Sequence, residues 1–177
     1  KGKHFEKRQA FKSGYFYCDE GETLFTLTTR KGATILQTLR TAWSGGVLGN
    51  TNANVETRRK LERNSYRACV VVAFQPSCGS ALVADSHGGT PQRFIFASAT
   101  DIEMPTVAPN NPGVLEYDPT NELVAIRVHA EILRELDTNK VNRARGTVQI
   151  DALDTHVDYN RLRVAALFAL LDHRRII

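Results

Sequence analysis

The stretch RACVVVAFQP, residues 67–76, decides the fold class of this 177-residue chain. Its centre is a continuous run of apolar and β-branched residues, which is typical of a central strand covered on both faces in a parallel sheet. Pro76 ends the run, because proline has no N–H to donate to a neighbouring strand. Gln75 is therefore expected where the carboxyl end of that strand presents a side chain.

The segments before and after this run alternate between predicted strands and helices. A short aromatic strand is expected at Tyr15–Cys18 and a helix at Thr34–Trp43, followed by a polar excursion with the character of a hairpin. A third strand is expected at Phe94–Ser98. This order predicts an α/β domain with a parallel sheet flanked by helices.

The chain as a whole is expected to fall into three segments. Residues 1–104 would form the α/β part, residues 105–119 a proline-rich linker or loop, and residues 120–177 a small helical region. Within the last segment, apolar residues recur at helical spacing over 130–136 and 158–174.

The composition indicates a globular protein without a membrane span. Hydrophobic residues make up 42% and charged residues 24% of the chain, and no run of about 18 apolar residues occurs. No signal-peptide pattern opens the chain, so we expect a cytoplasmic protein. The five histidines show no metal-site spacing. The three cysteines, which form no C-x-x-C motif, are expected to be buried, reduced thiols: Cys18, Cys69 and Cys78.

Polar side chains follow the predicted strands at their carboxyl ends, where parallel sheets bind ligands. Asp19 and Glu20 directly follow the aromatic strand. An apolar strand that ends in Asp-Glu is the Walker B pattern of nucleoside triphosphatases. In that pattern Asp19 would be a metal ligand that holds Mg²⁺, and Glu20 would polarise the attacking water. Alternatively, the pair marks only a strand that meets solvent.

Two further residues suit a phosphate-transfer site. The amide of Gln75 both donates and accepts hydrogen bonds, so it would orient the attacking water, or else it bonds only to nearby backbone. The planar guanidinium of Arg93 suits a phosphate in a neighbouring subunit's site, or else it forms an ordinary surface salt bridge. A small hydrolase that uses Cys18 or Cys78 with a histidine is the weakest alternative, because the sequence places no histidine with either thiol.

Charge is distributed unevenly along the chain. Residues 30–67 hold eight basic and two acidic residues, whereas residues 101–137 hold eight acidic and two basic ones. The densest basic cluster consists of Arg58, Arg59, Lys60 and Arg63. This cluster would contact a nucleic-acid backbone in a salt-dependent way, or it forms a solvated face paired with nearby glutamates. The basic residues at the start of the chain, 1–12, are interpreted as the end of a helix or linker.

Several stretches resemble the helicase-like ATPase module of primase–helicase replication proteins from actinobacterial phages and integrative elements. They are ILQTLRTAWSGGVLGNTNAN (35–54), SYRACVVVAFQP (65–76), GGTPQRFIF (88–96) and HVDYNRLRVAALFALLDHR (156–174). The resemblance implies a P-loop ATPase with a RecA/AAA+-like core that forms a homo-oligomeric ring, uses ATP and Mg²⁺, and acts on DNA.

The resemblance implies that residues 1–104 form the part of the ATPase core that runs from Walker B to an arginine finger. It also implies roles for single residues, including a second-sensor residue for nucleotide binding in the last helix. The matched positions are Asp19 and Glu20 for Walker B, Gln75 for the sensor, Arg93 for the arginine finger, and Arg161 or Arg163 for the second sensor.

One feature of that family is missing from the 177 residues. No phosphate-binding loop of the form G-x-x-x-x-G-K-[ST] occurs, and in the family this loop would lie upstream of Tyr15. Without its backbone N–H groups and its lysine, the chain alone is not expected to bind a triphosphate tightly. Two hypotheses follow. The chain is a fragment of a DNA-dependent ATPase/helicase motor, or it is a non-catalytic module that keeps the fold and binds nucleic acid or a partner.

Overall fold

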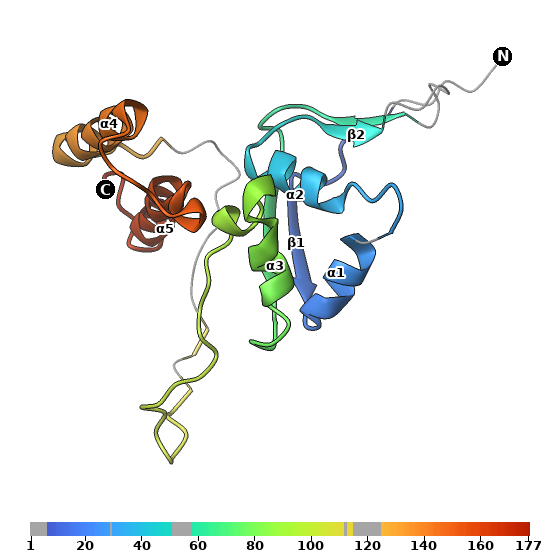
Figure 1. The fold of residues 1–177 in the computed structure, drawn as a ribbon. Coiled ribbons are helices and arrows are strands. Elements are labelled where there is room, and N and C mark those ends of the chain that lie inside the picture. Colours follow the sequence, from blue (N-terminus) through green and yellow to red (C-terminus); the bar gives the residue numbers. More distant parts are fainter. Residues whose placement is uncertain (1–6, 29, 51–57, 112, 115–124) are drawn as a thin grey trace. The chain divides into compact units, whose positions relative to one another are not determined.

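The computed structural model describes residues 7–28, 30–50, 58–111, 113–114 and 125–177 (Figure 1). Parts of the predicted excursion, the predicted linker and the acidic segment lie outside the described residues. The chain forms two compact units, Lys1–Arg93 and Phe94–Ile177.

Two parallel strands form the frame of the first unit. β1 (Ser13–Cys18) pairs with β4 (Arg67–Val72), with Ser13 opposite Arg67 and Cys18 opposite Val72. The pairing continues past the last ladder residues, because Ala73 N donates to Cys18 O (2.9 Å) and Gly21 N donates to Ala73 O (2.9 Å). The predicted α/β class and the parallel pairing are therefore confirmed.

The expectation that Arg67–Phe74 is a central strand covered on both faces is wrong. Among the described residues, the parallel sheet consists of β1 and β4, and four of the six residues of β4 are exposed. Exposed aromatic side chains also line β1, including Tyr15 and Phe16. An apolar run shows only that a segment is compatible with burial. Whether the strand is buried depends on which other segments pack against its two faces.

The predicted third strand at Phe94–Ser98 is also wrong. The segment follows the 3₁₀ helix η2 (Pro91–Arg93) and belongs to no helix or strand. Ile95 and Phe96 are both exposed. A strand forms only when a neighbouring strand satisfies its backbone groups, and no such ladder to this segment exists within the described residues.

Short helices and a hairpin complete the first unit. They are α1 (Gly21–Thr28), α2 (Ile35–Trp43), α3 (Ser80–Ala84) and the 3₁₀ helix η1 (Asp85–Gly88). β2 (Leu48–Asn50) and β3 (Arg59–Leu61) pair antiparallel, so the predicted helix over 34–43 and the hairpin are confirmed.

The most deeply buried side chains of this unit come from α3, from Thr90 and from the first two residues of η2. Leu82 is 2% exposed and Thr90 is 1% exposed, and Pro91 and Gln92 are buried with them. The segment before β2 is tied to the segment before β4 by Tyr66, whose hydroxyl donates to Gly46 O (2.7 Å). Burial raises the pKa of Tyr66.

The second unit is helical. α4 (Ala130–Arg145) and α5 (Val157–Leu171) flank the 3₁₀ helix η3 (Ala152–Asp154), and Arg143 joins the two long helices through an ion pair with Asp158 (2.7 Å). The predicted helices form, although the first extends to Arg145 and the second ends at Leu171. None of the described helices has the length and apolar character needed to cross a membrane.

Residues 94–111 and 113–114 contain no regular helix or strand. Between 105 and 114 the described residues are all exposed. The linker or loop over 105–119 lies partly outside the described residues and stays a prediction.

Candidate functional site

Three predicted site residues lie where the parallel strands β1 and β4 end, at what we call the carboxyl edge of the sheet. Asp19 and Glu20 follow the last residue of β1, and Gln75 follows β4 three residues after its end. Because the two strands are parallel and adjacent, their carboxyl ends lie at the same edge. All three residues are exposed, so a ligand at this edge would have direct access to them.

A glycine sets the path of the chain beside this edge. Gly21 begins α1 immediately after Glu20, and a Cβ at this position would overlap the ring of Phe74. Glycine therefore lets the start of α1 lie directly against the segment that leaves β4. On the other side, Gln75 O accepts from Cys78 N (2.9 Å) and Gly79 N (3.2 Å), which turns the chain towards α3.

The thiols near this edge bond to glutamates. The Cys78 thiol donates to Glu22 Oε1 (2.6 Å), and the Cys18 thiol donates to the carbonyl oxygen of Glu20 (3.2 Å). These contacts give no support to a cysteine–histidine hydrolase. All three cysteines are free, but the expectation that they are buried is wrong. Cys69 lies on the uncovered strand β4 and is exposed, and Cys18 and Cys78 are only half-buried.

The oxygen atoms at this edge fit Mg²⁺ but do not enclose it. In proteins Mg²⁺ keeps several waters and uses one or two carboxylates together with substrate phosphates, a role that Asp19 can fill. Within the described part of the chain, no group of three or more His, Cys, Asp and Glu side chains could hold a metal ion by itself. The triphosphate fits less well, because the sequence offers no phosphate-binding loop.

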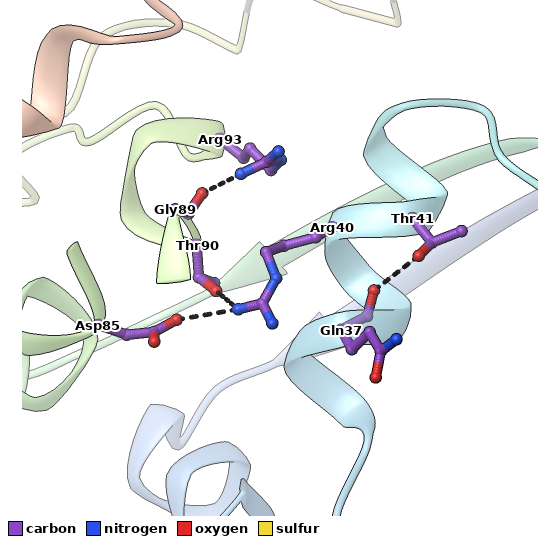
Figure 2. Close-up of polar contacts among 7 residues, drawn as sticks. All are labelled: Gln37, Arg40, Thr41, Asp85, Gly89, Thr90 and Arg93. Atoms are coloured by element: carbon purple, nitrogen blue, oxygen red, sulfur yellow. Dashed lines mark hydrogen bonds and ion pairs between the residues drawn. The ribbon is translucent and has the colours of Figure 1, made fainter. Parts of the chain in front are cut away.

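Arg93 is folded back onto its own unit. Its Nη1 atom donates to Gly89 O (Figure 2). Its guanidinium also lies over the ring of Trp43, 5.2 Å from the centroid. Burial lowers the pKa of Arg93, and the positive charge of Arg40 lowers that pKa further. The residue therefore packs as part of the fold, and it ends a 3₁₀ helix instead of beginning a strand.

Arg40 organises the surroundings of this segment. Its Nη1 atom donates to Thr90 Oγ1 (2.8 Å) and forms an ion pair with Asp85 Oδ2 (3.2 Å), as Figure 2 shows. Arg40 and Trp43 are three positions apart on α2, so both reach the Gly89–Arg93 segment from one helical face. Arg40 was not among the site residues predicted from the sequence, where its spacing from Trp43 was the available signal.

A second polar region is an open pocket of about 660 Å³ between residues 7–11 and the β2–β3 hairpin. Of the predicted basic cluster, Arg59 and Lys60 line it, and Lys60 also pairs with Glu62 (2.8 Å). Arg58 and Arg63 are exposed and are not among the residues that line it. The other side of the pocket is lined by Lys7, Arg8 and Phe11, which were not predicted as site residues. Their basic and aromatic character was visible, but nothing in the sequence placed them against the hairpin.

Arg161 and Arg163 lie on α5 in the second unit. Arg161 lines a smaller cavity of about 160 Å³ between α4 and α5 together with Asp158 and several apolar residues. Burial lowers the pKa of Arg163, and this effect outweighs the opposing influence of Tyr159. Their role in nucleotide binding stays a prediction.

Comparison with protein-family models, with curated proteins and with solved structures found no match to this chain. The resemblance to a helicase-like ATPase module therefore rests on the residues quoted above.

Proposed function

We propose that this chain is the Walker B-containing part of a DNA-dependent ATPase module from a primase–helicase replication protein. The supporting observation is the parallel pairing of β1 and β4, which puts Asp19, Glu20 and Gln75 at one exposed edge. Asp19 would hold Mg²⁺, Glu20 would act on the attacking water, and Gln75 would orient that water. The phosphate-binding loop would come from residues outside these 177.

Three further parts of this function are proposals of the same kind: a RecA/AAA+-like core, a homo-oligomeric ring and a cytoplasmic location. In such a ring, Arg93 would serve as the arginine finger only after leaving Trp43 and Gly89, which it contacts in its own unit. Asp19, Glu20 and Gln75 need no such rearrangement, so they carry the proposal.

The test measures Mg²⁺-dependent, DNA-stimulated ATP hydrolysis by the protein translated from the complete reading frame that contains these residues. We expect Glu20→Gln to lower kcat by about 100-fold or more, the usual contribution of a general base. The control is Glu103→Gln, which removes an exposed carboxylate from the second unit. A complete reading frame without a phosphate-binding loop, or hydrolysis that survives Glu20→Gln, would sink the proposal.

The basic pocket favours a second candidate, a non-catalytic module that binds nucleic acid. Basic side chains from two segments far apart in sequence gather there, which the solvated-face alternative does not require. We expect salt-sensitive DNA binding by the 177-residue chain itself. Replacing Arg58, Arg59 and Lys60 together with Glu should abolish that binding, and unchanged affinity would exclude this candidate.

A further inference from the structure

We propose that the pocket between residues 7–11 and the β2–β3 hairpin binds single-stranded nucleic acid, with phosphates on its basic side chains and a base stacked on Phe11. This inference rests on the second candidate function and specifies the class of nucleic acid that the pocket would take.

The charge of the pocket suits a phosphate backbone. Lys7 and Arg8 line one side and Arg59 and Lys60 the other, and all four of the charged residues described as lining it are basic. Side chains of this kind bind phosphates and release counterions from the nucleic acid, which makes binding weaken as salt increases. The Lys60–Glu62 ion pair is exposed, so a phosphate can compete with the glutamate for the lysine.

Phe11 adds an exposed aromatic ring to the pocket, which a site for phosphate alone would not need. Its side chain is 83% exposed and borders the pocket, so its ring face is open to a partner. Aromatic side chains beside basic grooves bind unpaired bases by stacking, and every base has a face that can stack. In a duplex the base faces are already stacked on each other, so this ring favours a single strand.

The segment that carries these side chains is fixed to the rest of the unit at three points. Lys7 Nζ donates to Arg58 O (2.8 Å), Gln9 Nε2 donates to Ser65 O (3.0 Å), and Arg67 N donates to Lys12 O (2.7 Å). Residues 7–12 are therefore held against residues just before and just after β3, and the pocket exists before any ligand arrives. A preformed site binds with a smaller loss of conformational entropy.

The hairpin wall depends on a glycine. A Cβ on Gly49 would overlap the backbone of Arg59 on the facing strand, and Gly49 adopts a φ of 155°. Glycine therefore lets β2 and β3 approach closely and form one continuous wall. The volume of about 660 Å³ lies within the range of about 300–1,000 Å³ that small ligands occupy, so a nucleotide unit fits.

The experiment measures fluorescence anisotropy of labelled oligothymidine of about 12 nucleotides, a length within the site sizes of single-strand binding folds. An oligouridine and a DNA duplex of the same length serve as the other probes. We expect the 177-residue chain to bind both single strands more tightly than the duplex. Phe11→Ala should weaken single-strand binding about 5- to 150-fold and leave duplex binding unchanged. Phe96→Ala, which removes a 60% exposed ring from the second unit, is the matched control.

A charge variant tests the phosphate contacts separately. Arg8→Gln combined with Arg59→Gln should lower the slope of log K against log salt by about 1.4, or about 0.7 for each lost contact to a single strand. It leaves the Lys7–Arg58 bond in place, and Arg134→Gln with Lys140→Gln on α4 is its control.

The outcomes separate the two proposals. Equal binding of single strand and duplex, or single-strand binding that Phe11→Ala does not weaken, overturns the single-strand inference and leaves general nucleic-acid binding in place. Binding to none of the three probes overturns both. Phe11→Leu, which keeps an apolar side chain without the ring, must bind like Phe11→Ala; wild-type affinity in Phe11→Leu also overturns the stacking role.

Discussion

The carboxyl edge of β1 and β4 and the Gly89–Arg93 segment were both predicted to hold site residues, but they differ in how far they are exposed to solvent. At the edge, Asp19, Glu20 and Gln75 are exposed and follow strands that are largely uncovered. In the Gly89–Arg93 segment, Thr90, Pro91 and Gln92 are among the most buried residues of the unit. The first region is open for chemistry, whereas the second holds the fold together.

This difference changes the meaning of the most specific part of the resemblance. The expected resemblance to the helicase-like proteins rests above all on the GTPQRF part of GGTPQRFIF, and Arg93 in this stretch was expected to reach a neighbouring subunit. In the structure, Arg93 contacts Gly89 and Trp43, and Arg40 ties Thr90 to Asp85. A recognisable motif can therefore record packing requirements as well as catalytic ones. The following variants test whether the two regions really separate stability from chemistry.

Leu82→Ala should have the largest effect on stability. Leu82 is 2% exposed, so its truncation removes buried apolar surface and leaves a cavity, at a cost of about 2–5 kcal/mol in the free energy of unfolding. Urea denaturation followed by the fluorescence of Trp43 measures the change, because this is the single tryptophan and it lies in the same unit. The neighbouring Val83→Ala, at a position that is 41% exposed, should cost much less. Equal losses would show that α3 does not anchor the core.

Thr90→Val should destabilise the unit by about 1.5 kcal/mol. The substitution keeps the shape of the side chain but removes the oxygen that accepts from Arg40 Nη1, and hydrogen bonds to charged groups are worth about 1.5–3 kcal/mol. The lower end applies because Asp85 remains as a partner of Arg40. Thr90→Ser keeps the acceptor and serves as the control in the same denaturation measurement. If Val and Ser variants unfold alike, the hydrogen bond contributes nothing.

The sequence was sufficient to predict the elements whose pattern is local. The strands β1 and β4, the helix α2, the hairpin and both long helices of the second unit correspond to segments with clear periodicity, turn residues or apolar runs. Their parallel pairing also followed from the order of elements. The expected third strand failed because a strand needs a partner, and the apolar FIFAS segment carries no information about whether one is present.

The candidate sites also differ in whether local sequence patterns could predict them. The positions of Asp19, Glu20 and Gln75 at one edge follow from strand direction alone, so the sequence could place them. The packing of Arg93 on Trp43 and the docking of residues 7–12 along the hairpin connect segments about 50 residues apart. Such contacts arise from tertiary packing, which local patterns do not encode.

Arg93→Ala should cost about 1 kcal/mol in the free energy of unfolding. It removes the cation–π contact with Trp43 and the hydrogen bond to Gly89 O, each of which is modest because the side chain is only partly buried. The emission of Trp43 in the native state should also change, since a charge leaves its ring. Arg93→Lys keeps a cation and should lose less. Unchanged stability and unchanged emission would show that the contacts of Arg93 with Trp43 and Gly89 do not stabilise the fold, which would favour its predicted role as an arginine finger.

The smallest effect on stability is expected at the carboxyl edge. Glu20→Gln and Asp19→Asn should each change the free energy of unfolding by less than about 0.5 kcal/mol, as is usual for exposed positions outside structural networks. The contacts that Glu20 makes with Cys18 and Thr23 use its backbone oxygen, which the substitution retains. Urea denaturation by Trp43 fluorescence, with the Thr90 variants in the same series, gives the comparison directly. A loss above about 1 kcal/mol at either carboxylate would make the acid pair part of the fold, and a structural role would then compete with the proposed one in ATP hydrolysis.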